Sequence, residues 1–391
     1  MTRVCMLSTS FPRYPGDFAG TFIYSMAKGL VQQGIPVTVV APASPSNRRS
    51  ETMEGITVHR FSYWWPHRCQ AVAYRDGIPT NLRRPAAWFQ LPTFLLSFLF
   101  TALRVTAGHD VIHVHWLPLI SIGIILRWLF KAPVVVTALG SDVRLMPPAF
   151  TQWLSDHADA VLAPTCDQEV ALSKLGVSSL YPIPLPVDDS SFHPAVDASA
   201  AQEELRLPLD QPVVTFVARF DPIKDPLTLI EAIPQVLAQH KEVTFLVVGD
   251  GPLWAKVQTR AHELGLDDRV RLTGMRTDIN QILQLSALFL ALSPTENVWS
   301  TTIAEAMAVQ VPCIITAAGR SPEFFSDRIN CYLVPPQNPR ALAEAILHLL
   351  DDAELRKRIA IGGSKLLRAH DRTLARATTR LRTVYDIVLR R

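Results

Sequence analysis

Short apolar runs alternate with amphipathic segments along most of the chain, the pattern of β-strands and α-helices in alternation. The strands expected in the first half occupy residues 3–8, 37–41, 110–116, 134–138 and 158–165. Those expected in the second half occupy residues 213–218, 244–248, 270–276, 287–292 and 313–316. Strands separated by helices favour parallel sheets. The pattern therefore predicts an α/β protein with two Rossmann-like domains.

The proline-dense segment Pro182–Asp188, PIPLPVD, separates the two halves and is typical of a stiff linker. The chain has 391 residues, of which 48% are hydrophobic, enough to fill two cores of ordinary size. We place the domain boundary near Val187. The expected domains span residues 1–187 and 188–372, followed by a last helix at 373–391.

Residues 44–90 show no clear periodicity and are predicted to be irregular, and an apolar helix, Leu91–Leu103, continues them. This part of the chain holds most of the excess positive charge, at Arg48, Arg49, Arg60, Arg68, Arg75, Arg83, Arg84 and Arg104. Aromatic residues are interleaved with these arginines, at Phe61, Tyr63, Trp64, Trp65, Tyr74, Trp88 and Phe89. We interpret segment 44–104 as facing an anionic membrane, although an ordinary excursion that buries its tryptophans also fits. We expect no nucleic-acid partner, because no motif for one is present.

The apolar stretch Leu91–Leu103 is about a dozen residues long, short of the roughly 20 that span a bilayer. The first residues show no signal-peptide form, and the five cysteines form no CxxC pair. We therefore expect a cytoplasmic protein with reduced thiols, peripheral on the cytoplasmic face of the membrane.

Glycines punctuate the loop after the first strand, at Gly16 and Gly20. Their spacing is not that of a nicotinamide fingerprint or a Walker loop, but glycine here lets a ligand approach the backbone. On the strand at 110–116, His113 and His115 share one face. A metal pair and a structural pair both fit these histidines, and we favour the structural pair because no third ligand lies nearby.

Ser293–Thr316 predicts a strand exit, a polar loop, a helix and another strand. Ser300 is a good N-cap, so Ser300, Thr301 and Thr302 would offer free amides at a helix N-terminus. Glu305 lies one turn further along. On the pattern alone, a capped surface helix with a solvated glutamate fits as well as an anion site.

Arg219 and Lys224 follow the first strand of the second half, where two cations can neutralise a diphosphate. Together with Glu-Ala-Met-Ala at residues 305–308 and Gly-Ser-Asp at 140–142, they resemble the motifs of a known family. The family is the retaining glycosyltransferases of the GT-B fold, glycosyltransferases group 1 (family 4 type). The resemblance covers nearly the whole chain.

The resemblance implies two Rossmann-like domains facing across a cleft, with a C-terminal helix that crosses back to the first domain. It also implies catalytic or donor-binding roles for Arg219, Lys224, Glu296, Asn297, Asp142, Gly16, Gly20, Gly274, Met275, Arg276, Ser300, Thr301, Thr302 and Glu305. Of these, Arg219 and Lys224 would hold the diphosphate and Glu305 the ribose. Two departures from the family pattern stand out. Leu139 replaces a histidine, and the first family glutamate falls on Asn297, with Glu296 one place early.

The resemblance implies retaining, metal-independent transfer of a hexose-type sugar from a UDP- or GDP-linked donor, with no further cofactor. The acceptor would be a glycan, a lipid-linked molecule or a small molecule. Three alternatives stay open: a sugar-nucleotide epimerase of the same architecture, a non-catalytic nucleotide-sugar binder, and a membrane-docking scaffold.

Overall fold

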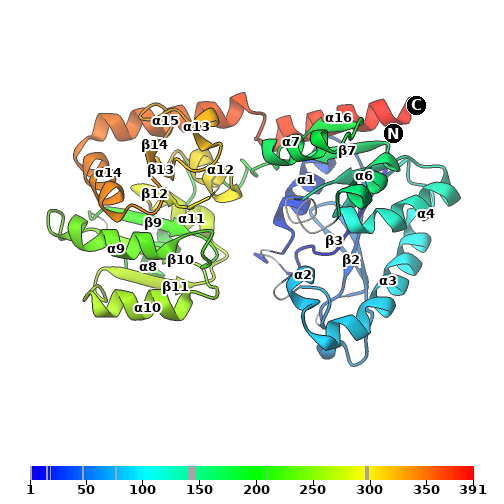
Figure 1. Cartoon of the computed structure of the whole chain (residues 1–391), viewed down its shortest axis with the longest axis horizontal. Coiled ribbons are helices and arrows are strands. Elements are labelled where there is room, and N and C mark those ends of the chain that lie inside the picture. The colour runs from blue at the N-terminus through cyan, green and yellow to red at the C-terminus, as the bar shows by residue number, and fades with distance from the viewer. Residues whose placement is uncertain are drawn as a thin grey trace. The chain divides into compact units, whose positions relative to one another are not determined.

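The computed structural model describes residues 2–14, 16–17, 19–45, 48–74, 77–139, 147–208, 210–295 and 299–391. The chain forms two compact units (Figure 1). Unit 1 comprises Met1–Pro186 together with Leu374–Arg391, and unit 2 comprises Val187–Thr373. These bounds lie one residue from those expected of the sequence, and the last helix belongs to unit 1.

Unit 1 is built on an eight-stranded sheet with the order β3-β4-β2-β1-β5-β6-β7-β8. Its strands are β1 (Val4–Ser8), β2 (Val37–Pro42), β3 (Ser50–Met53), β4 (Ile56–Phe61), β5 (Val111–His115), β6 (Val134–Thr137), β7 (Ala160–Ala163) and β8 (Leu180–Pro182). All neighbours are parallel except β3 and β4. The strand order reverses between β1 and β5, where open α/β sheets bind ligands beyond the carboxyl ends of their strands.

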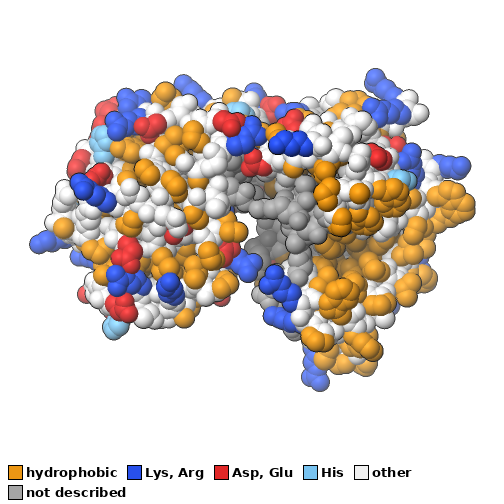
Figure 2. Space-filling view, in the orientation of Figure 1, with side chains coloured by type: hydrophobic (Ala, Val, Ile, Leu, Met, Phe, Trp, Pro, Cys, Tyr) orange, Lys and Arg blue, Asp and Glu red, His pale blue; other side chains and the backbone are white. Residues whose placement is uncertain are grey.

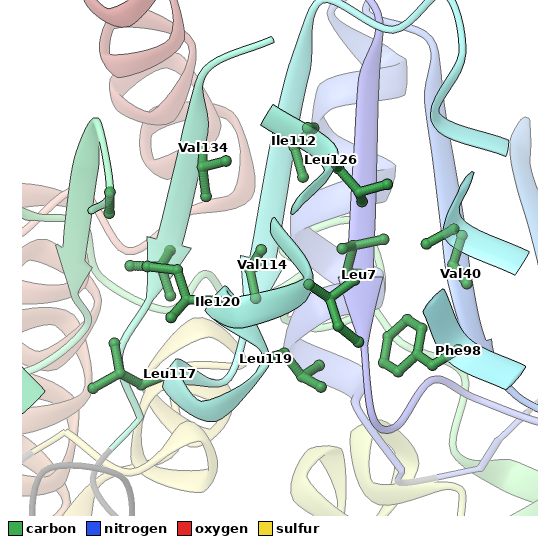
Figure 3. Close-up of a cluster of buried hydrophobic side chains, with 14 of the residues drawn as sticks. Leu7, Val40, Phe98, Ile112, Val114, Leu117, Leu119, Ile120, Leu126 and Val134 are labelled. Atoms are coloured by element: carbon green, nitrogen blue, oxygen red, sulfur yellow. The ribbon is translucent and has the colours of Figure 1, made fainter. Parts of the chain in front are cut away.

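Helices cover both faces of this sheet. They are α1 (Thr21–Gln32), α2 (Ile78–Asn81), α3 (Pro85–Thr106), α4 (Ile120–Phe130), α6 (Pro148–Asp156), α7 (Cys166–Lys174) and α16 (Leu374–Leu389). Because side chains alternate along a strand, Val4 and Met6 of β1 pack in the cluster that holds α1 and α16. Leu7 lies in the opposite cluster, to which α3 contributes Phe98 (Figure 3).

The expectation that residues 44–90 are irregular is wrong. The antiparallel hairpin β3–β4 extends the edge of the sheet, and it turns at Glu54 and Gly55, both with positive φ. The hydrophobic pattern does not predict this hairpin, because one of its inward-facing residues is an arginine. Arg60 is buried, pairs with Glu51 and hydrogen bonds to the carbonyls of the β1–α1 loop, so it cannot face a membrane.

The apolar helix is also longer than expected. α3 runs over 22 residues, from Pro85 to Thr106, and passes through Pro92. Its length and mean hydropathy of 1.5 would suffice to cross a membrane. Phe94 and Phe98, however, lie buried against the sheet, which is the arrangement of a core helix.

Unit 2 has a six-stranded, all-parallel sheet with the order β11-β10-β9-β12-β13-β14. Its strands are β9 (Val213–Val217), β10 (Thr244–Val248), β11 (Val270–Gly274), β12 (Leu288–Ala291), β13 (Cys313–Thr316) and β14 (Tyr332–Val334). Its helices are α8 (Ser199–Glu204), α9 (Pro226–Leu237), α10 (Trp254–Glu263), α11 (Ile279–Gln284), α12 (Thr301–Ala308), α13 (Ser321–Phe324), α14 (Pro339–Asp351) and α15 (Ala353–Ala369). The order reverses between β9 and β12, so this sheet is a doubly wound Rossmann sheet.

Candidate active site

The loop between β9 and α9 presents two cations on either side of a buried anchor. Phe220 is fully buried, and its ring stacks on Trp254 of α10 with centroids 5.5 Å apart. The Arg219 side chain is 55% exposed, and its one ion pair among the described residues is with Asp221, at 3.9 Å. Lys224 is half-buried and has no ion pair within the described part of the chain. The anchored loop thus holds both cations while leaving their charge largely uncompensated.

Asp221 and Asp225 fix the path of this loop. The Asp221 carboxylate accepts hydrogen bonds from the amides of Ile223 and Lys224, at 3.0 and 3.1 Å. Asp225 adopts a left-handed conformation with φ 45°, and its carboxylate accepts a bond from Thr228 at 2.7 Å. Aspartate tolerates this conformation better than most residues because its short side chain bonds locally. The backbone that carries Lys224 is therefore held in place before any ligand binds.

Two glycines in the β10–α10 turn support the same loop from behind. Gly249 has φ +137°, and a Cβ there would lie 1.8 Å from the carbonyl oxygen of Ala218. A Cβ on Gly251 would lie 2.5 Å from the carbonyl oxygen of Phe220. The Phe220 amide also donates to the Asp250 carbonyl at 2.9 Å. Only glycine lets the two backbones approach this closely.

The β12–α12 segment supplies a helix N-terminus. The Ser300 hydroxyl caps α12 by accepting from the Ile303 amide at 3.3 Å, as the sequence predicts, and contacts the Thr302 hydroxyl at 3.0 Å. The Thr301 side chain is exposed. Trp299, directly before the cap, is buried with φ 47° beneath the guanidinium of Arg372, which lies 4.3 Å from its ring centroid. The buried indole anchors the start of α12.

Glu305 lies in the second turn of α12 and is half-buried. No hydrogen bond or ion pair of its carboxylate occurs within the described ranges. Loss of water around the carboxylate raises its pKa to about 7 from an ordinary 4.5. Such a group gains from a ligand that donates hydrogen bonds to its ionised form.

The two segments converge because β9 and β12 are neighbours. They pair in parallel, with Leu288 opposite Val214 and Leu290 opposite Phe216, so both loops leave the sheet at one edge. This edge is the point where the strand order reverses. It gathers Arg219, Lys224 and the capped start of α12, a combination suited to an anion.

The predicted base-binding residues follow β11, two strands away from β9. Gly274 has φ 71°, and its carbonyl accepts from the Gly249 amide at 2.9 Å. Met275 is 52% exposed. Arg276 donates to both Glu204 and Asp278, so its guanidinium is already engaged. It also lines an open cavity of about 610 Å³ beside β11 and α8, which neither Lys224 nor Glu305 lines.

In unit 1, close backbone contacts and paired charges hold the described part of the β1–α1 loop. Gly20 has φ 71°, and a Cβ there would lie 2.5 Å from the Ser10 carbonyl oxygen. Gly16 also has positive φ, at 83°. Arg13 is neutralised by buried Asp17 at 2.6 Å, and Arg60 donates to the carbonyls of residues 11 and 12. This loop presents backbone rather than free charge.

The two histidines of β5 differ in their surroundings. The ring of His113 is hydrogen bonded to Tyr385 of α16 at 2.7 Å and to Thr137 at 2.8 Å, as expected of a structural residue. His115, at the carboxyl end of β5, has no hydrogen-bond partner for either ring nitrogen among the described residues. Burial lowers its pKa to about 3, so its ring is neutral. Among the residues described, no cluster of three or more histidine, cysteine or acidic side chains could hold a metal.

Several predicted residues lie outside the described residues. They are Asp142, with Gly140 and Ser141 beside it, and Glu296 and Asn297. Sequence reasoning did not assign a role to Gly249 and Gly251. The Gly-Asp-Gly-Pro tetrapeptide directly after β10 was the available signal, since glycines there indicate a close backbone approach.

Two family models of known proteins together match most of the chain. Residues 19–181 match the family model "Glycosyl transferase 4-like domain" and residues 211–352 match "Glycosyl transferases group 1". The chain is 26% identical to a D-inositol 3-phosphate glycosyltransferase of Corynebacterium glutamicum, with 98% of this chain and 96% of the relative covered.

Two solved structures share the fold over nearly their full length. Sucrose-phosphate synthase from Thermosynechococcus elongatus superposes with a TM-score of 0.74 at 21% identity, covering 99% of each chain. Alr3699/HepE from Anabaena, solved in complex with UDP-glucose, gives a TM-score of 0.73 at 18% identity. That match covers 99% of this chain and 100% of the other. The two α/β units are thus those of the GT-B fold.

Proposed function

The chain belongs to the glycosyl transferases group 1 and is a glycosyltransferase of the GT-B fold, and from this premise we propose that it transfers a hexose-type sugar from a nucleoside diphosphate sugar with retention of configuration. Transfer proceeds without a metal ion. Arg219 and Lys224 supply the positive charge for which a metal would otherwise serve.

One observation carries this proposal. Arg219 and Lys224 stand with little charge compensation on an anchored loop, beside the capped N-terminus of α12, at the edge where β9 and β12 emerge together. A diphosphate fits these groups because a guanidinium binds two phosphate oxygens, an ammonium acts as a point charge, and helix amides favour anions.

The same two cations assist the chemical step as well as donor binding. Negative charge on the diphosphate grows as its bond to the sugar breaks, so fixed cations stabilise the transition state more than the ground state. The Glu305 carboxylate accepts hydrogen bonds from the ribose hydroxyls of the donor. Departing phosphate takes the acceptor proton on the face where the new bond forms, so no separate general base is assigned.

The donor base is uracil or guanine, and the acceptor is a glycan, a lipid-linked molecule or a small molecule. The UDP-glucose complex of Alr3699/HepE supports the donor class, and the D-inositol 3-phosphate glycosyltransferase relative supports a hydroxyl acceptor. The enzyme works in the cytoplasm, peripheral on an anionic membrane.

A thermal-shift screen of UDP, GDP, ADP and their sugars tests the donor proposal, because a ligand that binds the folded state raises the unfolding temperature. We expect one diphosphate and its sugar to stabilise the protein in the presence of a metal chelator. The product formed from that donor should keep the donor's anomeric configuration by NMR. Stabilisation by none of them, or an inverted product, would contradict the proposal, and release of an epimerised sugar without acceptor would favour an epimerase.

A further inference from the structure

A continuous set of large hydrophobic side chains covers the outside of unit 1. Figure 2 shows them gathered where Figure 1 draws α3 and α4. This outer apolar face consists of side chains that are each at least 42% exposed: Trp88, Phe89, Leu95, Leu96, Phe100, Ile125, Trp128 and Leu129. Monomeric soluble proteins rarely expose so many large apolar groups together.

The face arises because α3 is hydrophobic on both sides. Phe94, Phe98 and Ala102 recur at helical spacing and lie buried in the unit 1 core. The opposite stripe carries Phe89 and Leu96 in place of the charged residues that an exposed helix side usually has. A helix that is apolar all round is normally surrounded by apolar material. Only one side of α3 is covered by the part of the chain that the structure describes.

Positive charge accompanies this face. The stretches 77–109 and 111–139 contain no aspartate or glutamate. Arg83, Arg104 and Lys131 are exposed and have no ion pair within the described ranges. Arg104 lies over the ring of Phe100, with its guanidinium carbon 3.9 Å from the centroid. Exposed aromatic and aliphatic groups with basic residues among them match the surface of an anionic bilayer.

We propose that the outer apolar face docks unit 1 onto an anionic lipid bilayer, with α3 and α4 lying along the headgroup region. The charges favour a bilayer over a second copy of the chain, since two copies of one face would bring like charges together. A peripheral attachment is favoured as well, because the buried side chains of Phe94 and Phe98 keep the other side of α3 in the core of unit 1. This attachment rests on the membrane association proposed above and names the surface that makes it, and it does not depend on the sugar transfer.

Co-sedimentation with vesicles tests the docking. We expect the full chain to bind vesicles of phosphatidylcholine mixed with phosphatidylglycerol, and to bind phosphatidylcholine alone much more weakly. The triple variant Phe89→Ser, Leu96→Ser, Trp128→Ser should lose at least about tenfold in vesicle affinity, since each side chain contributes apolar burial. The control Ile329→Ser removes a 60% exposed side chain of unit 2 and should bind like the parent protein.

A second variant set separates charge from apolar burial. The triple variant Arg83→Gln, Arg104→Gln, Lys131→Gln should bind the anionic vesicles at least about tenfold more weakly than the parent protein. The reason is that each basic residue near an anionic surface contributes to the attraction. Binding by the parent protein should also fall as salt rises. A cooperative thermal transition at the unfolding temperature of the parent protein, measured without ligand, shows that a variant is folded.

Three results would overturn the docking. One is a parent protein that ignores anionic vesicles, and another is a triple-serine variant that binds them as well as the parent. The third is a parent protein that elutes as a dimer without binding vesicles while the triple variant is monomeric. That result would identify the face as a contact between copies. None of these results depends on the donor site, so docking and sugar transfer can fail separately.

Discussion

The two units share one scaffold but differ in how they use charge. In unit 2, the loop after the first strand of its sheet leaves Arg219 and Lys224 with little compensation. In unit 1, the corresponding loop neutralises Arg13 with Asp17 and ties its carbonyls to buried Arg60. The same strand–loop–helix connection therefore carries cations suited to an anion in unit 2, whereas in the described part of the unit 1 loop Arg13 is paired with an acidic side chain.

Their outer helices differ in the same sense. The surface of unit 2 carries ion pairs such as Arg260–Glu231 and Arg340–Glu344. In unit 1, Arg127 of α4 pairs with Asp159, but most of the exposed side chains of α3 and α4 are large and apolar. Surface ion pairs contribute little stability but keep a surface compatible with water. These ion pairs of unit 2 are compatible with water, while one side of unit 1 is suited to an apolar partner.

The largest effect should come from removing the glycine support behind the unit 2 loop. Gly249→Ala would place a Cβ 1.8 Å from the Ala218 carbonyl oxygen, at a φ of +137°. We expect it to lower the free energy of unfolding by about 4 kcal/mol, from backbone strain and displacement together. Any folded protein should have lost donor affinity, because the Arg219 loop must move.

Gly265→Ala is the matched control for this prediction. Gly265 also has positive φ, at +67°, but nothing lies within 4 Å of its Cβ position. Chemical denaturation should show a loss of about 1 to 2 kcal/mol, with unchanged donor affinity. Equal losses for the two variants would mean that Gly249 does not support the loop.

Removing one of the two cations should have the next largest effect, on turnover. Lys224→Ala should lower sugar transfer at least about tenfold, roughly 1.4 kcal/mol, because one charge-assisted contact to the diphosphate is lost. Lys256→Ala, on the exposed side of α10, should leave transfer unchanged. Normal turnover by folded Lys224→Ala protein would remove Lys224 from the mechanism.

Glu305 should make the stability of unit 2 depend on pH. Its folded-state pKa of about 7 lies above the ordinary 4.5, so the folded state holds the proton more tightly. The resulting stabilisation is present below 4.5 and is lost as pH rises through about 7. The melting temperature of Glu305→Gln relative to the parent protein should therefore rise over that interval.

Donor binding gives Glu305 an opposite signature. In the proposed ribose role, the ionised carboxylate accepts hydrogen bonds from the ribose hydroxyls, so the affinity of the parent protein should fall as pH drops below about 7. Glu305→Gln should bind weakly at every pH, and calorimetry over the same interval measures both. A parent protein with pH-independent affinity would disagree with a ribose role for Glu305.

Helix caps provide the smallest and sharpest contrast between the units. Ser300 caps α12 in unit 2, and Thr165 caps α7 in unit 1. Ser300→Ala and Thr165→Ala should each cost about 1 kcal/mol of stability. Only Ser300→Ala should also weaken donor binding, by a few-fold, because of these two helices only α12 is proposed to contact the diphosphate. Equal donor affinity in the two variants would argue that the α12 terminus makes no contact with the donor.

The strands of both sheets could be predicted where they are buried on both sides. β1, β9, β10 and β13 are continuous apolar runs bounded by polar or glycine-rich loops, and such runs leave few alternatives. β3 and β4 could not be recognised because they form an edge hairpin with polar alternation. The first turns of α3 were not predicted, because arginines directly precede them and polar residues lie among them.

The charged members of the site could be predicted because their residue types and spacing belong to a family motif. Their supports could not, because they join segments distant in sequence. The Phe220–Trp254 stack and the Gly249 approach to Ala218 exist only once β9 and β10 lie side by side. The roles of all the predicted site residues stay predictions, and Asp142, Glu296 and Asn297 also lie outside the described residues.

Calorimetric titration of the nucleoside diphosphate identified by thermal shift tests the central claim most directly. The double variant Arg219→Ala, Lys224→Ala should bind this ligand at least about a hundredfold more weakly than the parent protein, since two charge-assisted contacts are removed. It should melt like the parent protein in the absence of ligand. A double variant that is folded and binds the diphosphate with unchanged affinity would show that these cations do not form the donor site.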